Sequence, residues 1–176
     1  MRNDNTGILQ VYYGDGKGKT SSAVGQAVRA AGNGFTVCFV QFIKSGRGSG
    51  EINILENLHG IVYRAFGTGK FLKKSGIGEE DRKIVYSGME FVRKTIDNKD
   101  ADMLVLDEIG AVLELGIVSA EEILDLLNSG KGWLDFVLTG RSFPASIIKA
   151  ADLVTRIEKV RHHYDKGAAA RRGIEF

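Results

Sequence analysis

The residues with the clearest chemistry lie in residues 12–22, YYGDGKGKTSS, between a short apolar run and a predicted helix. Glycines in such a loop let backbone N–H groups converge on phosphate oxygens, while Lys19 supplies a positive charge and Thr20 offers a hydroxyl to Mg²⁺. The helix that begins there adds the partial positive charge of its N-terminus. The segment therefore predicts a nucleoside triphosphate as ligand.

The spacing of this loop departs from the standard phosphate-binding pattern. That pattern would place a glycine at position 13, where this chain has Tyr13, so the loop that starts at Gly14 is one residue shorter. Gly16 and Lys17 inside the loop are further differences. A glycine-rich turn with solvated lysines is the alternative interpretation. The flanking strand and helix favour the phosphate loop.

A second candidate is the pair Asp107 and Glu108, directly after the apolar run 103–106. Such a strand presents an acid opposite Thr20, and Mg²⁺ takes one or two carboxylates together with phosphate oxygens. Neighbouring strand residues point to opposite faces, so we do not expect both acids to bind the metal equally. The alternative is that the pair caps the next segment. Loop and strand together predict a nucleotide–Mg²⁺ site, without deciding whether Glu108 binds the metal or polarises a water.

Strands alternating with helices must position these residues. The predicted strands are residues 7–13, 35–43, 61–66, 103–106, 134–139 and 153–158. The predicted helices are residues 19–31, 79–97 and 144–151, and one that starts with a capping box at 119–122 and ends at about residue 127. The glycine-rich stretches 45–50 and 67–78 are predicted loops.

This alternation predicts an α/β fold of the P-loop NTPase type, a mainly parallel sheet with helices on both faces. Ligands of such sheets bind at the carboxyl ends of the strands. The segments at those ends are residues 14–20, 41–44, 107–108, 139–141 and the chain from 158 onward.

Length and composition indicate one domain, residues 7–176, after a loose polar tail at 1–6. The net charge of +2 gives no reason to expect nucleic acid as a partner. No apolar run approaches the roughly 18 residues of a membrane span, and the N-terminus has no signal-peptide core. The single cysteine, Cys38, cannot form an internal disulfide. We therefore expect a cytoplasmic protein without a membrane partner, and a buried, inert Cys38.

Several segments occur in one fixed order: GDGKGKT, RAAGNG, VQFIKS, LVLDEI, LTGR, and AADLVTRIE followed by GAAARRGIEF. Together they resemble the ATP:corrinoid adenosyltransferases, the cob(I)alamin adenosyltransferases of the single-domain P-loop type. The similarity covers nearly the whole chain from residue 7. A shortened phosphate loop is itself a mark of that family.

The resemblance implies transfer of the 5′-deoxyadenosyl group of ATP to the cobalt of a reduced corrinoid, with release of triphosphate. The nucleophile is then Co(I), so the protein needs no nucleophilic side chain. Its tasks are to align cobalt with C5′ and to stabilise negative charge on the leaving triphosphate. Lys17, Lys19, the loop amides and Mg²⁺ suit the second task.

The resemblance also implies roles for individual residues. Thr20 and Glu108 would contact Mg²⁺, with Asp107 as a supporting acid, and Lys19 and Arg141 would act on the triphosphate. For Arg141, pairing with a helix end or an acid is the alternative. The implied nucleotide- and corrinoid-binding residues are Gly14, Asp15, Gly16, Lys17, Gly18, Lys19, Thr20, Ser21, Arg29, Gln41 and Phe71.

One segment departs from the family pattern, in which a phenylalanine and a tryptophan associated with the corrin follow the glycine-rich segment 67–69. Here Phe71 replaces the phenylalanine after a one-residue shift, and no tryptophan follows. Trp133 lies elsewhere and is interpreted as a packing residue. The family has a lysine–histidine pair where this chain has His162 and His163.

Two other functions stay open. An ordinary P-loop phosphohydrolase or kinase, suggested by Lys19 and the acidic pair, would release ADP. A protein that binds ATP or corrinoid without turnover is suggested by the missing aromatic pair. For the leading hypothesis, the resemblance implies a homodimer, and we expect a flavoprotein as reductant.

Overall fold

The computed structural model describes residues 7–45, 50–69 and 76–174. Its centre is a six-stranded sheet in the order β3-β2-β4-β5-β1-β6, in which all neighbouring strands are parallel. The strands are β1 (Leu9–Tyr13), β2 (Val37–Phe42), β3 (Ile61–Phe66), β4 (Met103–Asp107), β5 (Asp135–Gly140) and β6 (Leu153–Arg156). Each lies within two residues of its predicted bounds, and the parallel α/β sheet is confirmed.

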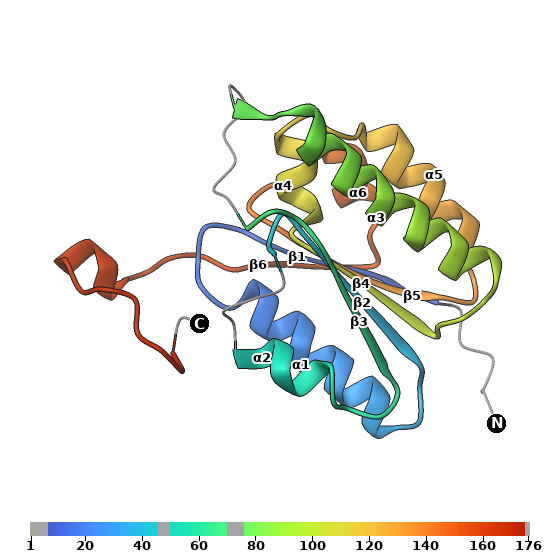
Figure 1. Cartoon of the computed structure of the whole chain (residues 1–176), viewed down its shortest axis with the longest axis horizontal. Coiled ribbons are helices and arrows are strands. Elements are labelled where there is room, and N and C mark those ends of the chain that lie inside the picture. Colours follow the sequence, from blue (N-terminus) through green and yellow to red (C-terminus); the bar gives the residue numbers. More distant parts are fainter. Residues whose placement is uncertain (1–6, 46–49, 70–75, 175–176) are drawn as a thin grey trace.

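Helices cover both faces of the sheet, as predicted (Figure 1). On one face lie α1 (Lys19–Gly32) and α2 (Gly50–Leu55). On the other lie α3 (Glu79–Asp97), α4 (Ile109–Glu114), α5 (Ala120–Gly130) and α6 (Ala145–Ala150). The sequence did not predict α2, α4 or the short 3₁₀ helix η2 (His163–Lys166), which have six residues or fewer. The predicted loop 45–50 is wrong at its end, because Gly50 begins α2; residues 46–49 lie outside the described part.

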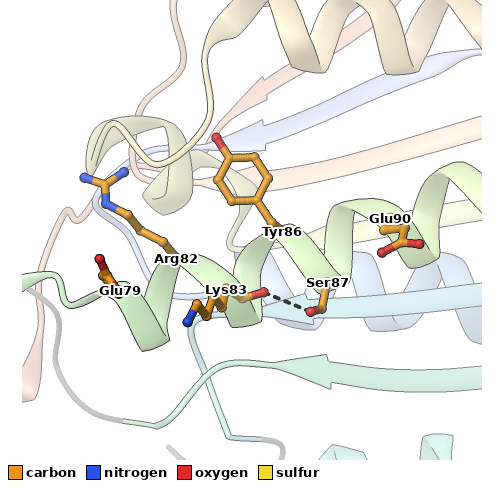
Figure 2. A pocket seen from close by; sticks show the side chains of 6 residues that line it. All are labelled: Glu79, Arg82, Lys83, Tyr86, Ser87 and Glu90. Atoms are coloured by element: carbon orange, nitrogen blue, oxygen red, sulfur yellow. Dashed lines mark hydrogen bonds between the residues drawn. The ribbon is translucent and has the colours of Figure 1, made fainter.

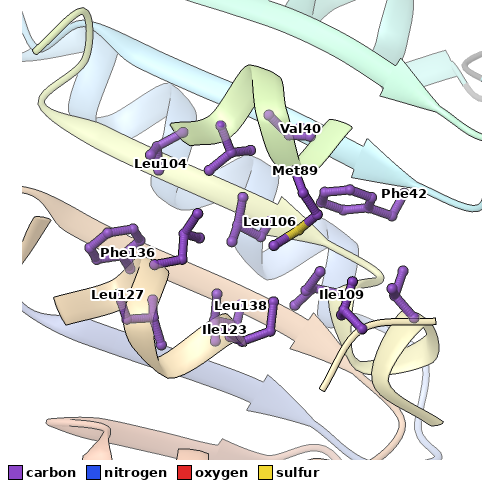
Figure 3. Close-up of a cluster of buried hydrophobic side chains, with 14 of the residues drawn as sticks. Val40, Phe42, Met89, Leu104, Leu106, Ile109, Ile123, Leu127, Phe136 and Leu138 are labelled. Atoms are coloured by element: carbon purple, nitrogen blue, oxygen red, sulfur yellow. The ribbon is translucent and has the colours of Figure 1, made fainter. Parts of the chain in front are cut away.

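Buried apolar side chains form one cluster on each face of the sheet. Figure 3 shows the larger cluster, where side chains of α3, α4 and α5 pack on β2, β4 and β5. In the smaller one, Ala23, Ala27 and Ala30 of α1 are buried against the sheet. Such small side chains let the helix lie close to the strands, which fixes the position of its first turn. The free Cys38 is buried in β2 as expected, and burial raises the pKa of its thiol to about 12.

The C-terminal segment leaves the body of the protein after β6. β6 is an edge strand whose four residues are all exposed. The chain then runs outward through η2 and turns back (Figure 1), so that Gly173 and Ile174 line a cavity together with residues 17–21 at the start of α1. None of the helices within the described residues has the length and apolar character needed to cross a membrane.

Candidate nucleotide-binding site

A cavity of about 510 Å³ lies at the start of α1, beyond the carboxyl ends of the strands. Its walls come from the predicted phosphate loop, α1, the ends of β2 and β4, α2 and the C-terminal segment. The residues that line it are Lys17, Gly18, Lys19, Thr20, Ser21, Val24, Lys44, Gly50, Glu51, Glu108, Gly173 and Ile174. Elements far apart in the sequence therefore converge on one space.

Backbone contacts hold the loop between β1 and α1 against the neighbouring strand ends. The Gly14 N–H donates to the Arg141 carbonyl (3.1 Å), and the Gly16 N–H donates to the Ile157 carbonyl (2.9 Å). Gly14 has φ 124°, and a Cβ there would lie 2.2 Å from the Ile157 oxygen. This glycine is thus required by close packing as well as by its backbone conformation.

The first turn of α1 is open to an anion. Among the described residues no side chain caps it, and its first turn contains no acid. α5 differs, because Ser119 and Glu122 form the predicted capping box, with hydrogen bonds of 3.1 and 2.8 Å. Uncapped N–H groups and the helix dipole together favour a phosphate at the start of α1.

Both lysines of the loop donate to backbone carbonyls beside the cavity. Lys19 Nζ donates to the Gly16 oxygen (2.7 Å), and Lys17 Nζ donates to the Ile174 oxygen (2.5 Å). Partial burial lowers the pKa of the Lys19 ammonium below its ordinary value; Glu108 acts in the opposite direction and Arg141 lowers it further. A phosphate anion would compensate the charge that burial disfavours.

Asp107 is fully buried behind Thr20, and hydrogen bonds occupy both of its oxygens. Its Oδ1 accepts from the hydroxyls of Thr20 (2.9 Å) and Thr139 (2.7 Å). Its Oδ2 accepts from Gln41 Nε2 (2.8 Å), and the Tyr63 hydroxyl in turn donates to Gln41 Oε1 (2.9 Å). Asp107 therefore orients the Thr20 hydroxyl rather than lining the cavity.

Glu108 lines the cavity beside Thr20, with its side chain 23% exposed. Its backbone has φ 61°, and its N–H donates to the Thr139 hydroxyl (2.8 Å). The Thr20 hydroxyl and the Glu108 carboxylate are hard oxygen donors of the kind that Mg²⁺ takes. This donor set fits the metal implied by the loop.

Lys44 faces both acids from the end of β2. Its Nζ lies 3.5 Å from Glu108 Oε1 and 3.7 Å from Asp107 Oδ2. Burial alone would lower the pKa of Lys44, but the Asp107 and Glu108 carboxylates outweigh it and raise the pKa above its ordinary value. The ammonium is thus held charged at the position where a metal cation is expected.

The structure brings most of the predicted residues together. Lys17, Gly18, Lys19, Thr20, Ser21 and Glu108 line the cavity. Asp107 and Gln41 lie directly behind it, and Gly14 and Gly16 anchor the loop. Arg141 is exposed and its carbonyl anchors Gly14.

Two predicted side chains, those of Asp15 and Arg29, point away from the cavity. The Asp15 carboxylate accepts from the Lys159 N–H (3.1 Å), which lowers the pKa of Asp15, so this side chain is turned toward the segment after β6. Arg29 is exposed in the last turn of α1, at the opposite end from the loop, because a straight helix separates it from Lys19. Phe71 lies outside the described residues.

Sequence reasoning did not single out Lys44, Thr139 or Tyr63. The first two lie in strand-end segments, 41–44 and 139–141, where the parallel-sheet rule places ligand contacts, and that rule is the signal for them. Tyr63 lies inside β3 and gives no such signal, since its role depends on its contact with Gln41.

A second hollow, of about 610 Å³, lies on the outward side of α3 (Figure 2). Its lining residues are Glu79, Arg82, Lys83, Tyr86, Ser87 and Glu90. All come from one helix, and Figure 2 shows their side chains spread along its surface. The Ser87 hydroxyl donates to the Lys83 carbonyl and the Tyr86 hydroxyl donates to the Ile117 carbonyl, so two of the polar groups are satisfied by backbone.

Solved structures with a similar fold include the flagellar accessory protein FlaH from Methanocaldococcus jannaschii, with a TM-score of 0.57 and 15% identity over 86% of this chain and 71% of that one. A KaiC-like protein from Pyrococcus horikoshii has a TM-score of 0.54 and 15% identity over 87% of this chain and 72% of its own. At this identity the likeness concerns the fold alone, and it supports the predicted P-loop NTPase-like class.

Comparison of sequences is more specific. The model of the family "ATP:corrinoid adenosyltransferase BtuR/CobO/CobP" matches residues 5–176. The corrinoid adenosyltransferase CobA of Salmonella typhimurium is 35% identical over 97% of this chain and 86% of its own length. Corrinoid adenosyltransferases of Escherichia coli and Pseudomonas aeruginosa are 34% and 32% identical, each over 98% of this chain and 87% and 85% of their own lengths. The chain belongs to the ATP:corrinoid adenosyltransferase family.

Proposed function

We propose that this protein transfers the 5′-deoxyadenosyl group of ATP to the cobalt of a reduced corrinoid and releases triphosphate. The main support for this function is the similarity to a corrinoid adenosyltransferase over 97% of the chain. The cavity beside the uncapped start of α1 agrees with it, because the reaction requires a site that holds a triphosphate.

The reaction requires the protein to bind both substrates and to stabilise the negative charge of the leaving triphosphate. Co(I) supplies an electron pair to C5′, the cobalt–carbon bond forms, and the C5′–O bond breaks with its electron pair on the triphosphate. Lys19 and the N–H groups of the first turn of α1 are placed to receive that charge, and Lys17 is a second cation at the same wall. Donors that are in place before the reaction stabilise the leaving group without reorganisation.

We assign the Mg²⁺ contacts to Thr20 and Glu108. Asp107 keeps the Thr20 hydroxyl in position through the 2.9 Å hydrogen bond, and Glu108 projects into the cavity from the end of β4. When bound there, the ion would offset negative charge on the phosphate oxygens.

Three further features of the enzyme are proposals from the family resemblance and the sequence. They are a homodimer, a flavoprotein that supplies the electron for Co(I), and a cytoplasmic location. β6 lies at the edge of the sheet with its four residues exposed, a position at which a second copy could pair, which agrees with a homodimer. Light scattering on the purified chain tests the dimer.

The test of function combines the protein with ATP, Mg²⁺ and chemically reduced cobalamin under strong reductant. We expect the visible spectrum of a cobalt–carbon bond, and inorganic triphosphate in the ³¹P NMR spectrum. ADP and phosphate formed without corrinoid would instead identify a phosphohydrolase or kinase. Binding of ATP or corrinoid without any product would identify a non-catalytic binding protein.

A further inference from the structure

Lys44 lines the cavity, but it takes no part in the contacts assigned above to Mg²⁺ and to the leaving triphosphate. It reaches the cavity from the end of β2, whereas Lys19 reaches it from the loop after β1. Two other strands, β4 and β5, lie between β2 and β1 in the sheet. The two ammonium groups therefore approach the cavity from separate parts of the sheet.

The backbone that carries Lys44 is strained. Ile43 has φ 68°, which is a genuine outlier for a β-branched residue. The Lys44 N–H donates to the Phe42 carbonyl (2.7 Å) and closes a three-residue turn of the rare, strained kind. Two bonds hold the turn, from the Ile43 N–H to the Phe66 oxygen (3.0 Å) and from the Gly69 N–H to the Ile43 oxygen (3.2 Å).

Strain of this kind gathers around the cavity. In the described residues, positive φ in residues other than glycine occurs at Ile43, Lys99 and Glu108. Ile43 precedes Lys44, and Glu108 is one of the acids that Lys44 faces. Strained backbone persists where surrounding structure enforces it and is concentrated at functional sites. The strain therefore points to a function for Lys44 and Glu108.

The contacts of Lys44 are those of an exchangeable cation. Asp107 already accepts three hydrogen bonds of 2.7 to 2.9 Å, so Lys44 is not needed to satisfy it. The ammonium lies farther away, at 3.5 and 3.7 Å from the two acids, on a flexible stem that is 41% exposed. An ammonium with three donors can turn from a carboxylate to a phosphate oxygen with little backbone movement.

We propose that Lys44 is a further triphosphate-binding residue, which neutralises Asp107 and Glu108 in the free protein and donates to a triphosphate oxygen when Mg²⁺ binds beside Glu108. This role rests on the proposed function, since it assumes a site for Mg²⁺ and triphosphate. A purely structural lysine would instead stay on the acids in every state.

The experiment measures two affinities that should change in opposite directions. Calorimetry with inorganic triphosphate and Mg²⁺ is carried out on the whole chain and on Lys44→Met, Lys44→Gln and Lys44→Arg. Loss of a charged donor to phosphate is expected to weaken binding about tenfold to a hundredfold in the first two variants. Lys44→Arg keeps the charge and should keep most of the affinity.

Electron paramagnetic resonance then measures Mn²⁺ binding without any phosphate. Removing the competing ammonium should tighten Mn²⁺ binding roughly fivefold or more in Lys44→Met and Lys44→Gln. Lys83→Met, on the outer side of α3, is the matched control and should change neither affinity. Thermal unfolding shows whether each variant is folded. Two neutral variants are used so that the test can still be made if one of them does not fold.

Unchanged triphosphate affinity in a folded neutral variant would overturn the proposal, and so would Mn²⁺ binding that is unchanged or weaker. Failure of the proposed function gives a different result. The wild-type chain would then bind triphosphate and Mn²⁺ with the expected dependence on Lys44, yet form no cobalt–carbon bond.

Discussion

Two hollows in the described part of the chain are similar in size and opposite in construction. The one at the phosphate loop has about 510 Å³ and takes its walls from residues 17–21, the ends of β2 and β4, α2 and the C-terminal segment. The one on α3 has about 610 Å³, and its described lining residues all come from that single helix. Both contain lysine and glutamate.

The difference is in what positions the charged groups. At the phosphate loop, close-packed glycines, a buried aspartate and two residues of positive φ fix where the polar atoms lie. On α3, side chains follow one another along an exposed helix surface (Figure 2), and the hydrogen bonds of Tyr86 and Ser87 tie their hydroxyls to backbone carbonyls rather than aiming them at a common point. Fixed donors are what binding and catalysis need, so convergence of elements identifies the site better than volume does.

The largest effect expected from this comparison is that of Lys19→Ala. Loss of a preorganised donor to the leaving group should slow adenosyl transfer about 10²- to 10³-fold. Lys83→Ala removes the same charge from the α3 hollow and should leave the rate unchanged. Single-turnover formation of the cobalt–carbon bond measures both. Equal losses in the two variants would mean that net charge, rather than position, matters.

Gly14→Ala tests whether the loop is held by close packing. Its φ of 124° disfavours a side chain, and the new Cβ would meet the Ile157 oxygen at 2.2 Å. Backbone strain alone should lower the free energy of unfolding by about 1–3 kcal/mol, and the contact with Ile157 should lower it further. We also expect weaker triphosphate binding. Denaturant titration measures the first and calorimetry the second.

The control for this variant is Gly116→Ala. Gly116 also has positive φ (69°), but a Cβ there would meet nothing within 4 Å. In Gly116→Ala, the free energy of unfolding should fall only by the cost of a side chain at positive φ, and the triphosphate affinity should stay unchanged. A Gly14 variant no less stable than the Gly116 variant would show that the contact with Ile157 does not hold the loop.

The sequence predicted the parts of this site that depend on local pattern. The loop with Lys19 and Thr20, the strand ending at Asp107, and the long helix 79–97 follow from residue types and periodicity. The six-residue helices α2 and α4 span too few residues to show a period and were not predicted, although α6, of the same length, was predicted as 144–151. The sequence also left open which acid faces the cavity, since that depends on the positive φ of Glu108.

The sequence did not predict how Lys44 contacts side chains of a distant segment. The pairing of Lys44 with two acids joins the end of β2 to the end of β4, and no local pattern specifies it. Arg29 is a different case, because its sequence motif matches the family although its side chain lies at the far end of α1. The predicted helix 19–31 already placed Arg29 far from the loop, so here the family match and the helix prediction disagreed, and the structure agrees with the helix.

The two adjacent acids should respond differently to neutral substitution. Asp107→Asn leaves one acceptor oxygen for donors on two sides: the Thr20 and Thr139 hydroxyls on one, Gln41 Nε2 on the other. Whichever way the amide turns, its NH₂ group faces a donor. An unsatisfied buried donor of this kind should cost about 1–3 kcal/mol of stability. Glu108→Gln lies at the cavity wall and should cost less than ~0.5 kcal/mol.

For Glu108→Gln the expected effect is on the metal. Turnover should need a higher Mg²⁺ concentration and recover when Mg²⁺ is in excess, because one oxygen ligand is weakened. Mg²⁺ titrations of both variants, with thermal unfolding beside them, separate the two roles. If Asp107→Asn were fully stable and Glu108→Gln strongly destabilised, the assignment of supporting and metal-binding acid would have to be reversed.

The smallest effects are expected in the α3 hollow. Tyr86→Phe removes the 3.0 Å hydrogen bond to the Ile117 carbonyl and should lower the free energy of unfolding by about 0.5–1.5 kcal/mol. Arg82→Ala changes an exposed side chain and should lower it by less than ~0.5 kcal/mol. Neither variant should change triphosphate affinity or the rate of adenosyl transfer, because the described residues that line this hollow are separate from those that line the cavity at the phosphate loop. A rate change of tenfold or more in Arg82→Ala, with stability retained, would show that a helix surface alone can contribute to the reaction and that the contrast between the two hollows is too simple.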